Sequence, residues 1–97
     1  MAKGYWIGRI DVHDLEEYAR YVAANATPFK KFGARFLVRG GQFVAPEGNA
    51  RERNVVIEFP SYEAALACYE SPEYQTAKGL RDPICEADLV IIKGYED

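Results

Sequence analysis

The first apolar residues of the chain occur at alternate positions between Gly4 and Val12. A period of two is typical of a strand that buries one of its faces. One face of this strand carries Trp6, Gly8, Ile10 and Val12, and the other carries Tyr5, Ile7, Arg9 and Asp11. We therefore predict a strand over residues 4–12, with one face toward a core and one mixed face away from it.

After the first strand the apolar residues recur at intervals of three and four, which predicts a helix. Asp14 is placed to cap this helix, with Glu17 as its reciprocal partner. Thr27-Pro28 marks either a kink or a new helix start. Gly33 is placed to end the helix, because glycine readily adopts the positive φ that a helix terminus needs.

Two further strand patterns follow, over residues 34–44 and 53–59. Gly40-Gly41 within the first indicates a bulge or a tight bend. The Pro-Glu-Gly-Asn stretch at residues 46–49 has the composition of a turn. Because the connection between the two strands is short, we expect them to be antiparallel.

Two capped helices and a last strand complete the pattern. Ser61 is a natural N-cap for a helix over residues 62–70. Ser71-Pro72 repeats the cap and adds a proline in the first turn, which predicts a second helix that ends near residues 78–80. The apolar run at residues 87–95 predicts the final strand.

The predicted order of elements, β-α-β-β-α-β, is that of the ferredoxin-like α+β fold. We expect a single domain over residues 1–97, built on a four-stranded antiparallel sheet. Right-handed crossovers would place the first and third strands side by side in its centre. The helices would then cover one face of this sheet.

The uncovered face of the sheet is predicted to be apolar. We expect it to carry Tyr5, Ile7, Leu37, Val56, Leu89 and Ile91. A patch of this kind is normally covered, and the simplest cover is the same face of a second subunit. The sequence therefore predicts a homodimer with its two sheets face to face.

Composition and charge exclude several classes of protein. The chain is 48% hydrophobic and 28% charged, which is ordinary for a soluble protein. No apolar run approaches the roughly 20 residues that cross a bilayer. The net charge of −3 comes from mixed signs and leaves no basic face for nucleic acid. Cys68 and Cys85 lack metal-site or CxxC spacing, and without a secretion signal we expect two reduced thiols in the cytoplasm.

Several short motifs resemble one known family. They are EFPS at Glu58–Ser61, SPEYQ at Ser71–Gln75, the later Arg81, and the pairs Gly40-Gly41 and Glu47-Gly48. Over nearly its whole length the chain resembles the domain of unknown function 1330 (DUF1330) family, although Pro46 stands where an aliphatic residue is expected.

The resemblance implies the dimeric α/β-barrel superfamily. Its architecture is similar to that of cofactor-free monooxygenases, muconolactone isomerases and chlorite-dismutase-like proteins. It implies no cofactor, and it assigns no catalytic residue that would transfer to this chain.

The charged residues of the strands give the first candidate site. By alternation, Arg9, Arg39 and Glu58 are expected to point away from the helices, into the space between the sheet and a partner. A charge there must be paired or solvated. Two arginines and one glutamate leave a positive charge over, which would hold a small carboxylate by bidentate hydrogen bonds. The alternative is an ion-pair network with a purely structural role.

Four other residues are weaker candidates. Tyr74 and Arg81 lie about two helical turns apart, so they share one side of a helix and would close one end of a cavity; packing and a salt bridge are the alternatives. His13 is either a general base or a solvated loop residue. Glu47 either places a carboxylate over the cavity mouth or belongs to a simple turn. One histidine and dispersed acids give no metal-ligand spacing.

Two hypotheses of function follow from these residues. The first is a cofactor-free enzyme, or a binder, that acts on a small organic acid in the cavity of the dimer. The second is a non-catalytic dimeric ligand-binding or accessory protein. A sealed, apolar cavity whose charges are paired with one another would favour the second hypothesis, and an open cavity that holds an anion or buffer molecule against Arg9 or Arg39 would favour the first.

Overall fold

The computed structural model describes residues 2–96 and contains the expected elements in the expected order. They are β1 (Gly4–Val12), α1 (Leu15–Lys31), β2 (Arg35–Arg39), β3 (Arg53–Phe59), α2 (Tyr62–Glu70), α3 (Pro72–Arg81) and β4 (Cys85–Lys93). A short 3₁₀ turn, Asp82–Ile84, joins α3 to β4 and contains Pro83. The second helical region is thus divided into α2 and α3, as the repeated cap at Ser71 predicts.

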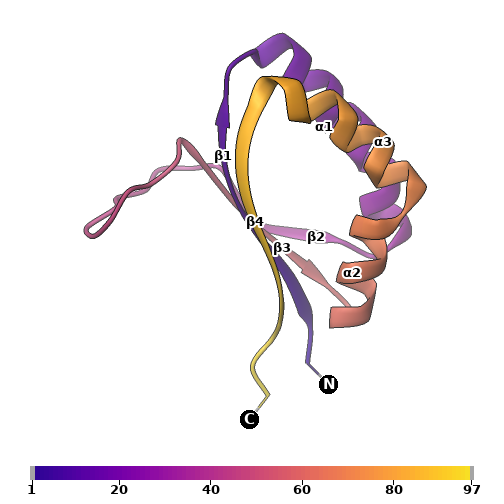
Figure 1. The fold of residues 1–97 in the computed structure, drawn as a ribbon. Helices are drawn as coiled ribbons and strands as arrows, with labels where there is room; N and C mark the ends of the chain where they lie inside the picture. Colours follow the sequence, from indigo (N-terminus) through magenta and orange to yellow (C-terminus); the bar gives the residue numbers. More distant parts are fainter. Residues whose placement is uncertain (1, 97) are drawn as a thin grey trace.

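The four strands form one antiparallel sheet in the order β2-β3-β1-β4. The first and third strands therefore lie side by side in the centre, as predicted. All three helices cover the same face of the sheet, and the opposite face is left open (Figure 1). The α+β, ferredoxin-like expectation is confirmed at the level of this arrangement.

Two strand boundaries differ from the prediction. The second strand ends at Arg39 rather than at residue 44, because Gly40 and Gly41 have φ angles of 74° and 107° and turn the chain away from the sheet. The last strand covers Cys85–Lys93 rather than residues 87–95. Its first residue pairs with Val12, the last residue of β1, so β4 begins where its partner ends.

The first helix continues through Pro28 to Lys31, so the open question at Thr27-Pro28 is resolved as one helix. Asp14 caps it, since its Oδ1 accepts a hydrogen bond from the backbone N–H of Glu17 at 3.1 Å. The Glu17 side chain pairs with Arg20 instead. Gly33 follows the helix with a φ of 75°, as a helix-ending glycine should.

An aromatic cluster around Trp6 joins the sheet to the helices. The Trp6 ring lies 4.9 Å from that of Tyr74 and 5.3 Å from those of Phe29 and Phe59, centroid to centroid. Its indole N–H donates to the backbone oxygen of Ala65 at 2.9 Å. Each aromatic pair adds about 0.5–1.5 kcal/mol beyond the area it buries, so this cluster fixes all three helices against β1.

The uncovered face of the sheet differs from the prediction in the last strand. Leu89 lies opposite Gly8 and Ile91 lies opposite Trp6, so both point toward the helices. The prediction for these two residues was wrong, because Leu89 to Ile92 are all apolar and give no alternation. Val90 and Ile92 take their places on the open face and are 53% and 46% exposed.

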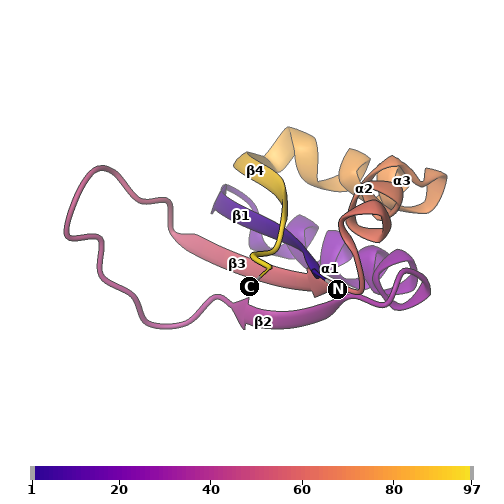
Figure 2. The ribbon, with the colours of Figure 1, turned by 90° about the horizontal axis from the view of Figure 1, so that it is seen from below.

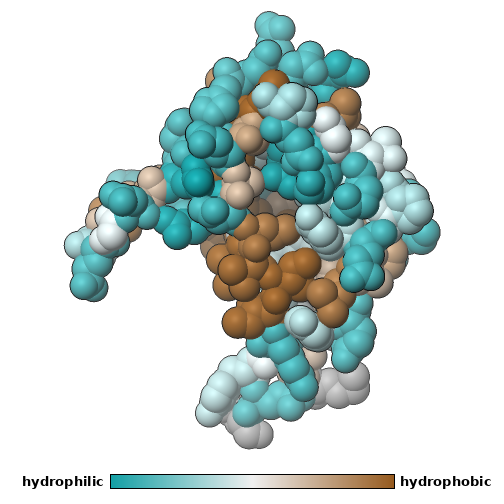
Figure 3. Space-filling model, viewed as in Figure 1, coloured by the Kyte–Doolittle hydropathy of each residue, from teal (hydrophilic) through white to brown (hydrophobic). Residues whose placement is uncertain are grey.

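Three of the remaining predicted members of the open face follow the prediction, and Leu37 has no partner in the register of β2 with β3. Tyr5, Ile7 and Val56 lie on the open face through the register of β1 with β3. Figure 3 shows apolar side chains gathered over the middle of β4. We call the set Ile7, Val56, Val90 and Ile92 the outer apolar patch.

A long loop over residues 40–52 joins β2 to β3 and extends away from the rest of the molecule, on the side opposite the helices (Figures 1 and 2). Its base is held by Arg51, which forms ion pairs of 2.8 Å with both Asp11 and Asp88. The turn prediction at residues 46–49 agrees with the φ of 74° at Gly48.

Candidate functional site

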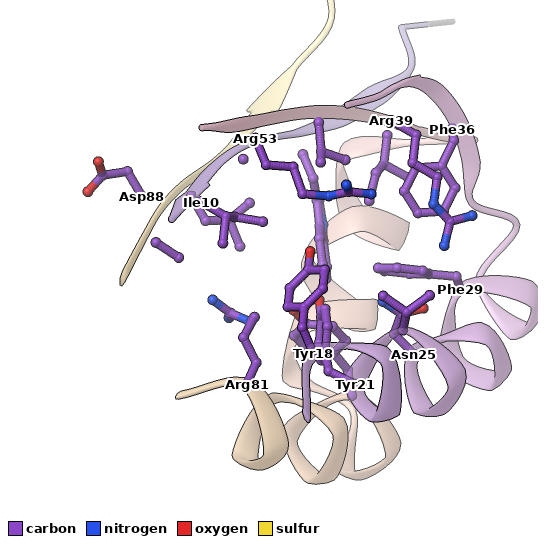
Figure 4. A pocket seen from close by; sticks show the side chains of 18 residues that line it. Ile10, Tyr18, Tyr21, Asn25, Phe29, Phe36, Arg39, Arg53, Arg81 and Asp88 are labelled. Atoms are coloured by element: carbon purple, nitrogen blue, oxygen red, sulfur yellow. The ribbon is translucent and has the colours of Figure 1, made fainter. Parts of the chain in front are cut away.

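A cavity lies between the sheet and the helices, and side chains from both layers line it (Figure 4). It holds about 50 Å³ of space that a water molecule can reach, within about 550 Å³ of empty space that includes its open mouth. A single buried water needs roughly 10–15 Å³ of such water-accessible space. The cavity therefore has room for several waters or for a small ligand.

Three arginines line this cavity, and they reach it from different elements. Arg53 begins β3 and lies on the same face as Val55 and Ile57, whose side chains are buried. Arg81 belongs to the last turn of α3. Arg39 ends β2, where its guanidinium stacks 4.1 Å from the ring centroid of Phe36. Figure 4 shows Arg53 and Arg39 on the sheet side and Arg81 on the helix side.

The arginines of the cavity have no acidic partner among residues 2–96. The ion pairs of that part of the chain involve other cations, and no carboxylate oxygen lies within 4.0 Å of Arg39, Arg53 or Arg81. Asp88 borders the cavity, but its carboxylate points away (Figure 4) and pairs with Arg51. The cavity therefore carries an uncompensated positive charge.

Two of these arginines also have unsatisfied donors. The Nε atoms of Arg53 and Arg81 are buried and have no hydrogen-bond partner. Arg81 as a whole is only 6% exposed. A buried donor without a partner costs about 1–3 kcal/mol, and more when it is charged. Such donors at a cavity wall are poised to bind an anion.

Tyrosines form the helix side of the cavity. The hydroxyl groups of Tyr21 and Tyr74 share a buried hydrogen bond of 2.8 Å. The Tyr21 ring lies 5.5 Å from the guanidinium carbon of Arg81, and the Tyr18 ring lies 5.6 Å from that of Arg53. Each arginine is thus steadied by the π face of one tyrosine, a contact worth roughly 0.5–2 kcal/mol.

Tyr18 and Tyr74 are neutral near pH 7. Burial raises the pKa of Tyr74 above the usual range of a phenol, and neighbouring Tyr21 adds to this shift. Burial likewise raises the pKa of Tyr18, against the opposing effect of the Arg53 charge. Burial lowers the pKa of Arg81, but nearby Tyr74 and Tyr21 outweigh it and the net shift is upward. The cavity therefore combines charged guanidiniums with neutral hydroxyl donors.

The structure brings together only some of the predicted site residues. Arg39, Tyr74 and Arg81 line the cavity. Arg9 and Glu58 lie on the open face, where Arg9 pairs in register with Asn54 and Glu58 with Tyr5. Four residues separate them along each strand, or about 13 Å. The predicted cluster of Arg9, Arg39 and Glu58 is therefore wrong as a grouping.

The cause is a bulge at Leu37. Phe36 pairs with Ile57, but the next pair is Val38 with Val56, so Leu37 is an extra residue in β2. The bulge reverses the faces beyond it and turns Arg39 toward the helices. Arg39 therefore lines the cavity between the sheet and the helices. The prediction had placed it in a space between the sheet and a partner subunit.

The remaining candidates lie outside the cavity. His13 has an exposed side chain, and its Nε2 is 3.3 Å from a carboxylate oxygen of Glu86. Glu47 is exposed in the extended loop. The position of His13 is that of a solvated loop residue, and the position of Glu47 is that of a residue in a turn.

Sequence reasoning missed Arg53, Tyr18, Tyr21 and Asn25. Arg53 alternates with Val55 and Ile57, so its position on the core face was readable from the strand pattern. Asn25 follows Tyr18 and Tyr21 at helical spacing and is 4% exposed at the cavity wall. A polar residue within an apolar helical stripe is the signal that identifies it.

The chemistry of the cavity is that of anion recognition. No histidine lines it, and its one carboxylate points away. Burial raises the pKa of the Cys68 thiol to about 12, so this cysteine is not a thiolate nucleophile at neutral pH. Residues 2–96 contain no group of three or more His, Cys, Asp and Glu side chains that would hold a metal ion. Across the same residues, no helix combines the length and apolarity needed to span a bilayer.

Comparison with known families agrees with the resemblance. Residues 3–95 match the family described as "Domain of unknown function (DUF1330)", and the chain belongs to that family. No curated protein matches the chain. The family assignment therefore brings no activity with it.

Solved structures share the fold at low sequence identity. A protein of unknown function from Rhodopseudomonas palustris is 16% identical with a TM-score of 0.76, and the match covers 99% of this chain and 85% of that one. SnoaB, a cofactor-independent oxygenase from Streptomyces nogalater, is 13% identical with a TM-score of 0.66, over 100% and 97%. A dimeric ferredoxin-like protein of unknown function from Thermobifida fusca is 13% identical with a TM-score of 0.55, over 98% and 92%. At these identities the likeness shows the fold alone.

Proposed function

We propose that this protein binds a small organic acid in the cavity between its sheet and its helices. The observation that carries the proposal is the pair of buried, unpartnered Nε donors of Arg53 and Arg81 at the wall of one cavity. A carboxylate there would accept charge-assisted hydrogen bonds from guanidinium groups, which are about twice as strong as neutral ones. The ligand would also balance a positive charge that residues 2–96 leave uncompensated.

The apolar part of the ligand would contact the rest of the wall. Ile10, Phe29 and Leu89 line the same cavity. Ligand sites commonly combine an apolar lining with a few polar groups that fix orientation. We therefore expect a carboxylate on a short hydrocarbon or aromatic skeleton rather than an inorganic anion.

The hydroxyl pair of Tyr21 and Tyr74 supports a second candidate function, a cofactor-free enzyme that acts on the same acid. Two phenol hydroxyl groups beside Arg81 would stabilise an oxyanion that develops on the substrate. The cavity has no histidine or inward-pointing carboxylate to act as a general base. A non-catalytic ligand-binding role is therefore better supported than an enzyme.

We also propose a homodimer of the dimeric α/β-barrel type, located in the cytoplasm. The outer apolar patch supports the dimer, because Ile7, Val90 and Ile92 are exposed, and Val56 is half-buried, on a sheet face that no helix covers. The dimeric description of the Thermobifida fusca protein is in line with it. The free thiols of Cys68 and Cys85 support a reducing compartment.

A thermal-shift screen of small carboxylates tests the binding proposal. A ligand at 100 times its dissociation constant stabilises the fold by about 2.7 kcal/mol, which is about 10–20 °C for a domain of this size. Arg53→Met should weaken the shift, since it removes one of the guanidinium groups of the cavity and keeps much of the side-chain volume. Arg9→Met is the matched control, because Arg9 lies on the opposite face of the sheet. A shift in Arg53→Met as large as that of the native protein, or no shift with any carboxylate, would contradict the proposal.

A further inference from the structure

The three arginines of the cavity do not converge on one point. Arg53 lies against Tyr18 and Arg81 lies against Tyr21, at 5.6 Å and 5.5 Å from the respective ring centroids. The two tyrosine rings are themselves 5.5 Å apart. The contacts thus form a row in the order Arg53, Tyr18, Tyr21 and Arg81, with one arginine at each end.

The two ends of the row belong to different layers of the fold. Arg53 reaches the cavity from β3 in the sheet, and Arg81 reaches it from the last turn of α3 (Figure 4). Arg39 lies on the Arg53 side of the cavity in the same view. One positive group therefore stands on the helix side, and two stand on the sheet side.

Each end has its own unsatisfied donor. The Nε of Arg53 and the Nε of Arg81 are both buried without a hydrogen-bond partner, and no carboxylate within residues 2–96 pairs with either side chain. Arg81 is the more enclosed, at 6% exposed. A ligand with one carboxylate would satisfy one end and leave a buried cation unpaired at the other, which is costly.

We infer that the ligand is a dianion with its two acidic groups at opposite ends, such as a dicarboxylic acid. This inference rests on the proposed function and specifies its ligand class. One carboxylate binds Arg81 on the helix side. The other binds Arg53 and Arg39 on the sheet side, and the skeleton between them lies along the rings of Tyr18 and Tyr21.

The experiment compares acids of matched length by isothermal titration calorimetry at constant ionic strength. The probes are the dicarboxylates succinate, glutarate and adipate, and the corresponding monocarboxylates butyrate, valerate and hexanoate. We expect at least one dicarboxylate to bind more than tenfold tighter than its monocarboxylate partner. Inorganic phosphate, which has its charge on a single group, should bind no better than the monocarboxylates.

Two variants test the two ends separately. Arg81→Met and Arg53→Met should each lower the affinity for the best dicarboxylate to about the level of its monocarboxylate partner. Because Arg81 is buried, Arg81→Lys serves as a second variant if the methionine form fails to fold. It keeps the charge but removes the bidentate geometry.

The possible results separate this inference from the proposed function. Equal affinities for mono- and dicarboxylates, both lost in Arg53→Met, would overturn the dianion and leave carboxylate binding intact. Tighter binding of phosphate than of any dicarboxylate would also overturn it. Binding of dicarboxylates that is unaffected by both variants would contradict the cavity as the site and with it the proposed function.

Discussion

Ser71 serves two helices at once. Its hydroxyl donates a hydrogen bond of 2.7 Å to the backbone oxygen of Cys68, near the end of α2. The hydroxyl oxygen of Ser71 also accepts a hydrogen bond of 3.2 Å from the backbone N–H of Tyr74, at the start of α3. Because Tyr74 reaches from this turn into both the aromatic cluster and the cavity, the cap fixes a residue of the candidate site.

Replacement of Ser71 by alanine should destabilise the protein. Loss of an N-cap costs about 0.5–2 kcal/mol, and the side chain is 7% exposed, so water does not readily replace it. The denaturant midpoint measures this loss. Ser61→Ala is the matched control, because Ser61 caps only α2 and is less buried; we expect the smaller effect there. A Ser71→Ala midpoint equal to that of the native protein would show that the double cap adds no stability.

At the scale of elements, the extended loop is tied to the sheet at its base. Asp11 of β1 accepts from the backbone N–H of Glu52 at 2.9 Å and from Arg51 at 2.8 Å. Arg51 continues to Asp88 of β4, so one side chain connects the loop with two strands. These contacts hold the start of β3, which is also where Arg53 turns into the cavity.

This anchor predicts a dependence on pH. The hydrogen bond from Glu52, with Arg51 next, holds the pKa of Asp11 below its usual value of 3.8. Unfolded Asp11 therefore binds a proton more readily than folded Asp11. Its contribution to stability is complete above the usual value and is lost as the pH falls through the lowered one.

We expect Asp11→Asn to be less stable than the native protein at about pH 6 and to lose less stability below about pH 4. Urea midpoints across this range measure both effects. Asp14→Asn is the control, since asparagine also caps helices well and Asp14 has no ion pair within residues 2–96. Parallel midpoint curves for the native protein and Asp11→Asn would contradict the proposed anchor.

At the scale of the molecule, the sequence predicts most of the fold and part of the site. Alternation identifies the faces of β1 and β3, and cap residues locate both later helices. The face of Arg39 was not predictable by alternation, because a bulge at Leu37 leaves no composition signal in this strand. The faces of β4 depend on the pairing of Ile91 with Trp6, since four consecutive apolar residues carry no alternation. A cavity depends on how side chains fail to fill a space, and only the assembled layers reveal that.

The corrected faces of β4 sharpen the prediction of a homodimer. Val90 lies on the outer apolar patch, and neighbouring Leu89 packs against the core on the helix side. Stable interfaces bury on the order of 1,200–2,000 Å² and exclude charge from their centre. We expect Val90→Asp to convert the dimer into a folded monomer, because it places a carboxylate beside Ile7 within the outer apolar patch.

Light scattering at micromolar concentration, together with circular dichroism, measures assembly and folding separately. Val44→Asp is the matched control, since Val44 is 86% exposed on the extended loop, and its dimer should persist. Ile91→Asp should instead lose the folded state, because Ile91 lies opposite Trp6 and packs against the core away from the arginines of the cavity, where an unpaired carboxylate is costly. A native protein with the mass of one chain, or a Val90→Asp variant that remains dimeric, would contradict assembly through the outer apolar patch. If Val90→Asp unfolded the protein and Ile91→Asp gave a folded monomer, the assignment of the two faces of β4 would be reversed.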